Sequence, residues 1–208
     1  MLVKECMSKN VVSIRESAFI QDALQLMKEH SIRHLPVFSD SGEFVGWITD
    51  SDVRGVLIAS MLEEISVADV MVRKPLTIRP DDYVEDAARL MIEKKIGGLP
   101  VVDDSQVVGV ITVVDVLKAS MELLGITRFA SRLDLIFPED GKDVELAKVV
   151  SIVEDNGGKI QSLYSSQEGK YSLYLKQGDM SRISGALENA GLHVVCTEAR
   201  KGGESLKS

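Results

Sequence analysis

The sequence predicts an α/β fold of the α+β type, with two β-α-β-β-α units packed as a pseudo-symmetric pair and followed by a smaller β-α-β-β-α-β domain. Three observations lead to this prediction. The segment 1–62 is repeated in 63–124, apolar residues recur with helical and strand periods inside each copy, and a different order of elements begins after Thr127. We therefore expect domains at 1–62, 63–124 and 128–200.

The repeat is visible when Met7 is aligned with Met71. The register shifts only at the turn after Asp40, where the first copy is one residue longer. Matches at so many positions make chance a poor explanation, so each copy is expected to form one structural unit. The matched pairs include Ile14 with Ile78, Ala23 with Ala87, Leu35-Pro36-Val37 with Leu99-Pro100-Val101, Thr49 with Thr112 and Asp52 with Asp115.

Each copy is expected to open with a short strand, at residues 11–14 and 76–78, which leads into an amphipathic helix. Apolar residues at positions i, i+3, i+4 and i+7 indicate the helix, and Asp82 with Glu85 approximates a capping box at its start in the second copy. The apolar positions are Ile20, Ala23, Leu24 and Met27 in the first copy, and Val84, Ala87, Ala88 and Met91 in the second.

A β-hairpin is expected after the helix in each copy. Its strands cover 35–38 and 44–49 in the first copy and 99–102 and 107–112 in the second, because β-branched runs flank a polar turn there. A final helix starts near Asp50 or Val113. One copy alone would leave a sheet face uncovered, so the two copies are expected to pack together.

The junction between the last strand and the last helix carries the chemistry of each copy. Backbone N–H groups and a threonine hydroxyl, from Thr49 or Thr112, converge there at a helix N-terminus, which favours a phosphate. Asp52 or Asp115, three residues later, could accept both hydroxyls of a ribose. A single such junction is also a common helix cap, but its occurrence in both copies favours a ligand site.

The duplicated unit resembles a tandem CBS-domain pair, or Bateman module, over about residues 1–124. The resemblance implies clefts between the copies that bind AMP, ADP, ATP, S-adenosylmethionine or a related ligand, and it implies a homodimer. It further implies that Thr49 and Thr112 contact phosphate and that Asp52 and Asp115 contact ribose. By the same resemblance adenine would contact the strands near Ser13, Ile14, Thr77, Ile78, Leu35, Pro36, Leu99 and Pro100.

The two sites are not expected to be equal. Arg33 and His34 precede the proline in the first copy, where the second has glycines, and Arg54 corresponds to Leu117. These three residues are candidates for the charge that a polyphosphate needs, although each could equally be a solvated surface residue. Trp47, which corresponds to Val110, either lines the site or fills core space.

The remaining chain predicts a β-α-β-β-α-β domain of the ferredoxin-like type. Strands are expected at 132–137, 159–165, 171–176 and 193–198, with helices at 144–156 and 180–190. This order, with the loop 138–141, resembles an ACT domain, a regulatory module that often binds amino acids. Asp140 and Gly141 are its weak site candidates, because a purely structural turn explains them as well. Two CBS units followed by an ACT-like domain resemble bacterial acetoin-utilization regulatory proteins.

Composition narrows the function class. The 208 residues carry a formal net charge of −8, which argues against a nucleic-acid polymer as partner, although a small anion could still bind. Cys6 and Cys196 match no disulfide or zinc spacing and are interpreted as ordinary thiols. No segment resembles a signal peptide, and the longest apolar stretch, 107–114, is too short to span a bilayer, so a cytoplasmic location without membrane partners is expected.

Catalysis is not expected. His30, His34 and His193 have no partner at metal-ligand or catalytic-triad spacing. The leading interpretation is a non-catalytic sensor that passes ligand binding in the CBS pair to the ACT-like domain or to a regulated partner. The alternative is a constitutive dimeric scaffold whose clefts stay empty.

Overall fold

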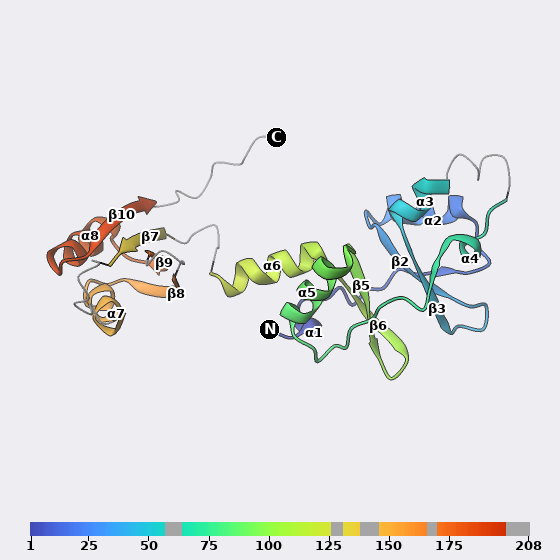
Figure 1. Ribbon diagram of the computed structural model, residues 1–208, viewed down its shortest axis with the longest axis horizontal. Helices are drawn as coiled ribbons and strands as arrows, with labels where there is room; N and C mark the ends of the chain where they lie inside the picture. The colour runs from blue at the N-terminus through green and yellow to red at the C-terminus, as the bar shows by residue number, and fades with distance from the viewer. Residues whose placement is uncertain (57–63, 126–130, 138–145, 166–169, 199–208) are drawn as a thin grey trace. The chain divides into compact units, whose positions relative to one another are not determined.

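A computed structural model of the protein describes residues 1–56, 64–125, 131–137, 146–165 and 170–198 (Figure 1). The chain divides into two compact units, Met1–Ala119 and Ser120–Ser208. The first unit contains the first copy of the repeat and the second copy as far as Ala119, and the second unit contains the end of the second copy and the β-α-β-β-α-β elements.

The expected helices and hairpins of the repeat are confirmed. In the first copy, helix α2 precedes the hairpin β2–β3, and α3 begins directly after β3. In the second copy, α5, β5, β6 and α6 follow the same order. Their bounds are α2 (Ile20–Glu29), β2 (His34–Phe38), β3 (Phe44–Thr49), α3 (Asp50–Val56), α5 (Val84–Lys94), β5 (Gly98–Asp103), β6 (Gln106–Thr112) and α6 (Val113–Leu123).

The first strand of each copy is shorter than expected. In the first copy it is β1 (Ile14–Arg15), parallel to β2, and in the second it is a single bridge from Ile78 to Val101. The Ile78 N–H donates to the Pro100 carbonyl, at 3.2 Å, and Ile78 accepts from the Val102 N–H, at 2.9 Å. Extending this ladder toward residue 76 would need an N–H at position 100, which proline lacks. Pro36 has the same effect in the first copy.

The two copies exchange their N-terminal segments. Helix α1 (Val3–Cys6) lies beside β6 and contributes Val3 to the core of the second copy, whereas α4 (Val67–Val70) contributes Val67 to the core of the first (Figure 1). Matching hydrogen bonds fix both segments: the Val67 N–H donates to Ala18 O at 2.8 Å, and the Val3 N–H donates to Asp82 O at 2.9 Å.

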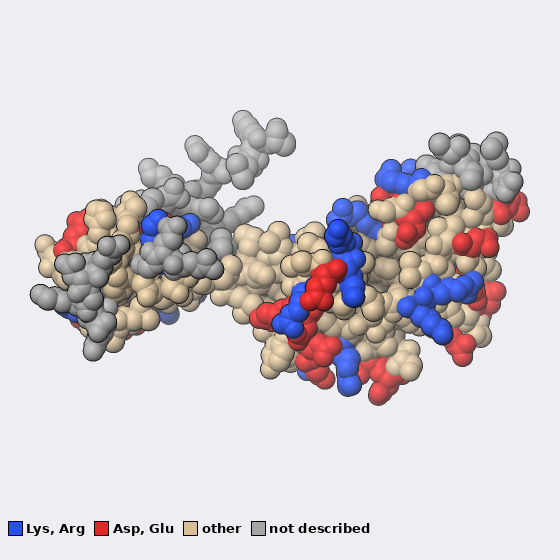
Figure 2. Space-filling model, in the orientation of Figure 1, with Lys and Arg blue, Asp and Glu red and all other residues tan. Residues whose placement is uncertain are grey.

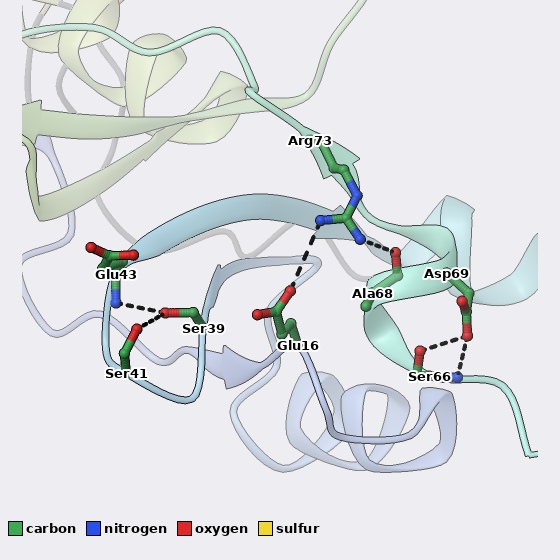
Figure 3. A network of polar contacts seen from close by, with 8 residues as sticks. All are labelled: Glu16, Ser39, Ser41, Glu43, Ser66, Ala68, Asp69 and Arg73. Carbon is green, nitrogen blue, oxygen red and sulfur yellow. Dashed lines mark hydrogen bonds and ion pairs between the residues drawn. The ribbon is translucent and has the colours of Figure 1, made fainter.

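Polar contacts also hold the exchanged segment of the second copy on the first. Strand β4 (Val72–Arg73) pairs with β3 and completes the sheet order β1-β2-β3-β4. Figure 3 shows the Arg73 guanidinium between Glu16, 3.9 Å away, and the Ala68 carbonyl, to which it donates at 3.1 Å. Ser66 and Asp69 close the first turn of α4 through a hydroxyl-to-carboxylate bond of 2.5 Å.

The second unit is built on an antiparallel sheet of order β10-β7-β9-β8. Its element order confirms the expected β-α-β-β-α-β pattern, and its core joins leucines of β7 and β9 to apolar residues of both helices. Asp140, Gly141 and the first two positions of the expected helix 144–156 lie outside the described residues. The bounds are β7 (Ser131–Ile136), α7 (Leu146–Asp155), β8 (Lys159–Ser165), β9 (Lys170–Gln177), α8 (Met180–Asn189) and β10 (His193–Glu198).

Candidate ligand-binding clefts

Two clefts open within the first unit, one at each strand-to-helix junction. The Thr49 cleft lies where β3 meets α3 and has a volume of about 470 Å³. The Thr112 cleft lies where β6 meets α6 and has a volume of about 260 Å³. Small-molecule sites typically occupy roughly 300–1,000 Å³, so the Thr49 cleft alone falls inside that range.

Matching positions of the repeat line the two clefts, and each cleft draws on both copies. The copy that supplies the threonine provides the junction, and the other copy provides the wall. The matched lining pairs are Trp47 with Val110, Ser51 with Val114, Val72 with Ser8, Pro75 with Val11, Leu76 with Val12, Lys95 with Ser31 and Ile96 with Ile32.

A closed hydrogen-bond motif forms at each junction. The Thr49 hydroxyl donates to Asp52 Oδ2 at 2.6 Å, the Thr49 N–H donates to the same oxygen at 2.9 Å, and the Asp52 N–H reaches the hydroxyl oxygen at 3.3 Å. Thr112 and Asp115 repeat the motif at 2.6, 2.9 and 3.4 Å. Each pair therefore caps its helix as well as lining its cleft. None of the hydrogen bonds within the described residues uses Oδ1 of either aspartate.

His34 occupies the boundary between the clefts and lines both. Its ring stacks on Trp47, with centroids 5.7 Å apart and planes inclined by 26°. A Cβ atom built on Gly97 or Gly98 would lie 3.1 or 3.3 Å from this ring, so the glycines leave the space that the imidazole fills. Burial, followed by the nearby Arg33 charge, lowers the pKa of His34 below its ordinary value, which favours the neutral imidazole.

The cationic side chains are distributed unevenly. Arg33 lines both clefts, and Lys95 lines only the Thr49 cleft. Arg54 lies outside both linings, and its Nε instead donates to Asp50 Oδ2 at 2.6 Å. On the described part of the face in Figure 2, basic and acidic side chains are interspersed.

The residues expected near adenine are not among those that line the two clefts. Leu35, Leu99 and Ile78 are buried in the cores, with Pro36 and Pro100 beside them. Ser13 and Ile14 line a separate pocket, and Thr77 is exposed. The clefts use the preceding residues instead, Val11 and Val12 in one and Pro75 and Leu76 in the other. The signal that could have found them is the proline of the neighbouring strand, which ends the ladder and releases these residues from it.

Trp47 combines both roles that the sequence left open. Its side chain is only 5% exposed, yet it lines the Thr49 cleft beside His34. Lys95 was not singled out from the sequence. It has a left-handed backbone, with φ of 55°, like its counterpart Ser31 with φ of 53°, and both lie in a cleft wall.

The described residues offer neither a cluster of metal ligands nor a membrane-spanning helix. Their His, Cys, Asp and Glu side chains form no group of three or more that could hold a metal ion. In the same part of the chain, no helix has the length and apolar character needed to cross a membrane.

The family model for the CBS domain matches this chain twice, at residues 3–59 and 67–122. A CBS domain-containing protein of Dictyostelium discoideum is 33% identical over 135 residues, covering 59% of this chain and 93% of that protein. L-aspartate semialdehyde sulfurtransferase of Methanosarcina acetivorans is 37% identical over 112 residues, covering 53% of this chain. The match spans only 22% of that enzyme's own length.

Solved structures share the fold of the first unit. CBSX2 of Arabidopsis thaliana, solved in complex with AMP, is 32% identical with a TM-score of 0.53, covering 59% of this chain and 97% of that one. The CBS domain pair of protein MJ0100, solved with methylthioadenosine and S-adenosylmethionine, is 31% identical with a TM-score of 0.54 over the same shares. A Vibrio cholerae protein assigned to acetoin utilization (AcuB) is 26% identical with a TM-score of 0.55, covering 61% and 96%.

Proposed function

The chain belongs to the CBS-domain family. We propose that it is a regulatory sensor that binds an adenosine-containing ligand in the Thr49 and Thr112 clefts. AMP, ADP, ATP and S-adenosylmethionine are the ligands of this class. The observation that carries the proposal is the pair of matching clefts, each with a threonine and an aspartate at the start of a helix. The AMP in CBSX2 and the adenosine compounds in MJ0100 support it.

The junction residues would divide the ligand between them. Oδ1 of Asp52 or Asp115 is the oxygen available to a ribose hydroxyl, since Oδ2 already accepts from the threonine. The single hydroxyl hydrogen of Thr49 or Thr112 would turn from Oδ2 to a phosphate oxygen, and the threonine N–H would keep the carboxylate in place. Arg33 would supply positive charge to the phosphate.

The base would lie between the apolar walls. Trp47 and Leu76 face the Thr49 cleft, and Val110 and Val12 face the Thr112 cleft. Pro36 and Pro100 act here by shaping those walls, because they release residues 11–12 and 75–76 from the sheet. Ser13, Ile14, Thr77, Ile78, Leu35 and Leu99 would support the walls from behind and leave the contact with the base to them.

Helix α6 would carry the signal onward without catalysis. It starts at Val113, directly after Thr112, and its last residues belong to the second unit. There the carbonyl of Leu124 accepts hydrogen bonds from the hydroxyls of Ser162, at 2.6 Å, and Tyr164. A ligand that reorients α6 would therefore act on β8 of the second unit, for which we propose an ACT-like regulatory role.

A second candidate function, a homodimeric scaffold with empty clefts, is favoured by one observation. Helices α5 and α6 expose large apolar side chains, including Ile92 at 77% and Leu117 at 60%. The first copy has Lys28 and Arg54 at the matching positions. Exposed apolar side chains on neighbouring helices are typical of protein interfaces. Homodimerisation is compatible with both candidate functions.

Thermal unfolding with AMP, ADP, ATP, S-adenosylmethionine and methylthioadenosine tests the proposal. A ligand at 100 times its Kd stabilises the folded state by about 2.7 kcal/mol, which is several degrees for domains of this size. The Asp52→Ala, Asp115→Ala double variant should lose that shift. Asp179→Ala is the matched control, because the Asp179 carboxylate caps α8 through the Ser181 and Arg182 N–H groups, in the second unit. It should keep the full shift.

The same measurement separates the two candidate functions. No shift with any adenosine compound would reject the sensor and leave the scaffold. A shift that persists in the double variant would place the ligand outside the two clefts. Light scattering then decides between monomer and dimer, with and without ligand.

A further inference from the structure

We infer that the Thr49 and Thr112 clefts are anticooperative toward phosphate-bearing adenosine ligands, because both clefts depend on the same cationic side chain, Arg33. The inference rests on the proposed function and deepens it. It concerns nucleotides such as AMP, and it predicts no such coupling for an uncharged compound such as adenosine.

The repeat does not provide each cleft with its own copy of this side chain. Arg33 and His34 line both clefts, and their counterparts in the second copy, Gly97 and Gly98, carry no side chain. The Gly97 and Gly98 positions cannot readily gain side chains, because a Cβ at either one meets the His34 ring at 3.1 to 3.3 Å. The boundary between the clefts therefore holds one arginine where two-fold symmetry would place two.

The Arg33 guanidinium is available to either cleft. Its backbone is held, because the Arg33 carbonyl accepts from the Asp50 N–H at 2.9 Å. Its side chain is exposed and forms none of the ion pairs or hydrogen bonds found within the described residues. A long side chain on a fixed backbone can turn toward one phosphate or the other.

Neighbouring charges do not replace Arg33 in the Thr112 cleft. Lys95 lines only the Thr49 cleft, and its counterpart in the Thr112 cleft is Ser31. Arg54 is engaged by Asp50 and lines neither cleft. Burial of His34 favours its neutral form. When both clefts hold a nucleotide, Lys95 can serve one phosphate and Arg33 the other, so one phosphate lacks the contact with Arg33 that it has when it binds alone.

The expected size of the coupling follows from the lost contact. A charge-assisted hydrogen bond changes affinity by roughly tenfold or more. Two AMP dissociation constants describe the wild-type chain, and one describes each cleft when the other cleft cannot bind. The product of the two wild-type constants should be about tenfold larger than the product of the two single-cleft constants. For adenosine the two products should be equal.

Isothermal titration of the full chain with AMP, and separately with adenosine, provides these constants. Asp115→Ala removes binding at the Thr112 cleft and so gives the dissociation constant of the Thr49 cleft alone, and Asp52→Ala does the converse. Two unequal but independent clefts would give the same product of constants in these variants as in the wild-type chain, whereas coupled clefts would not. In an Arg33→Ala background the AMP coupling should vanish, because no shared charge remains. In a Lys95→Ala background AMP should bind the Thr49 cleft more weakly, and the coupling should persist.

Each contrary result has a distinct meaning. Equal products for AMP would overturn the inference and leave the adenosine sensor intact. Coupling that survives Arg33→Ala would overturn it as well, because repulsion between the two phosphates would then be the cause. Absence of AMP binding would overturn this inference, and absence of binding by every compound of the thermal-unfolding series would overturn the proposed function with it.

Discussion

Gly46→Ala tests the exchanged architecture on which the Thr49 cleft depends. A Cβ at Gly46 would lie 2.4 Å from Met71 Sδ, 3.1 Å from Met71 Cγ and 3.2 Å from the Val72 carbonyl. Met71 is 7% exposed and belongs to the first copy's core, so its side chain has little room to move. Val72, which follows it, lines the cleft. Overpacking of this kind costs about 1–3 kcal/mol of the free energy of unfolding.

Urea unfolding measures this cost, and two further variants make the measurement specific. Gly55→Ala is the matched control: nothing lies within 4 Å of its added Cβ in α3, so it should gain roughly 0.5–1 kcal/mol. Met71→Ala alone removes core volume and should cost about 2–5 kcal/mol. In the Gly46→Ala, Met71→Ala double variant the Met71 side chain no longer clashes with the added Cβ. The double variant should therefore lose less unfolding free energy than the two single variants together, by roughly 1 kcal/mol or more.

Two results would contradict the packing of Met71 against Gly46. Gly46→Ala could prove as harmless as Gly55→Ala, or the costs at positions 46 and 71 could simply add. Either outcome would mean that Met71 does not pack on Gly46 as the exchanged arrangement requires. The second copy offers an independent repeat of the test, because a Cβ at Gly109 would lie 2.5 Å from Met7 Sδ.

Three further predictions concern the cap, the boundary histidine and the second unit. Thr112→Val removes the hydroxyl bonded to Asp115, so thermal unfolding of the ligand-free chain should show a loss of about 1 kcal/mol, and an unchanged midpoint would contradict the cap. The pKa of His34 is lowered from 6.5 by burial, so the stability it contributes should be complete above pH 6.5 and lost as the pH falls through the folded pKa. Urea unfolding across this range should therefore depend less on pH in His34→Gln, and parallel curves for the two proteins would refute the assignment. Asp179→Ala should lower the stability of the second unit by about 1 kcal/mol without changing AMP affinity, which thermal unfolding and titration together check.

Periodicity predicted the helices and hairpins well, because α2 and α5 are long amphipathic segments and the hairpin turns are polar. It missed α1 and α4, which have four residues each and owe their place to packing against the other copy. No local pattern in 1–62 indicates that residues near Val67 complete its core. Such long-range packing overrides local propensity.

The residues that line the two candidate clefts could be predicted only in part, for a similar reason. The threonine and aspartate of each junction lie in a cleft as expected, because their places follow from the strand-to-helix order. Arg54 lies outside both clefts, because it pairs with Asp50 one helical turn away. Lys95 could not be foreseen, since its place in the cleft depends on the left-handed end of α5 and on the meeting of the two copies.

Because the two copies exchange their N-terminal segments, each structural half of the Bateman module has different boundaries from the sequence repeat. A chain cut between residues 62 and 63 would separate Val67 and Met71 from the core that they complete. Residues 9–73 instead contain every strand of the sheet β1-β2-β3-β4 together with the helices that cover it. The structural half is therefore a shifted version of the sequence repeat, and we expect residues 9–73, rather than 1–62, to be the fragment that folds when a single copy is expressed.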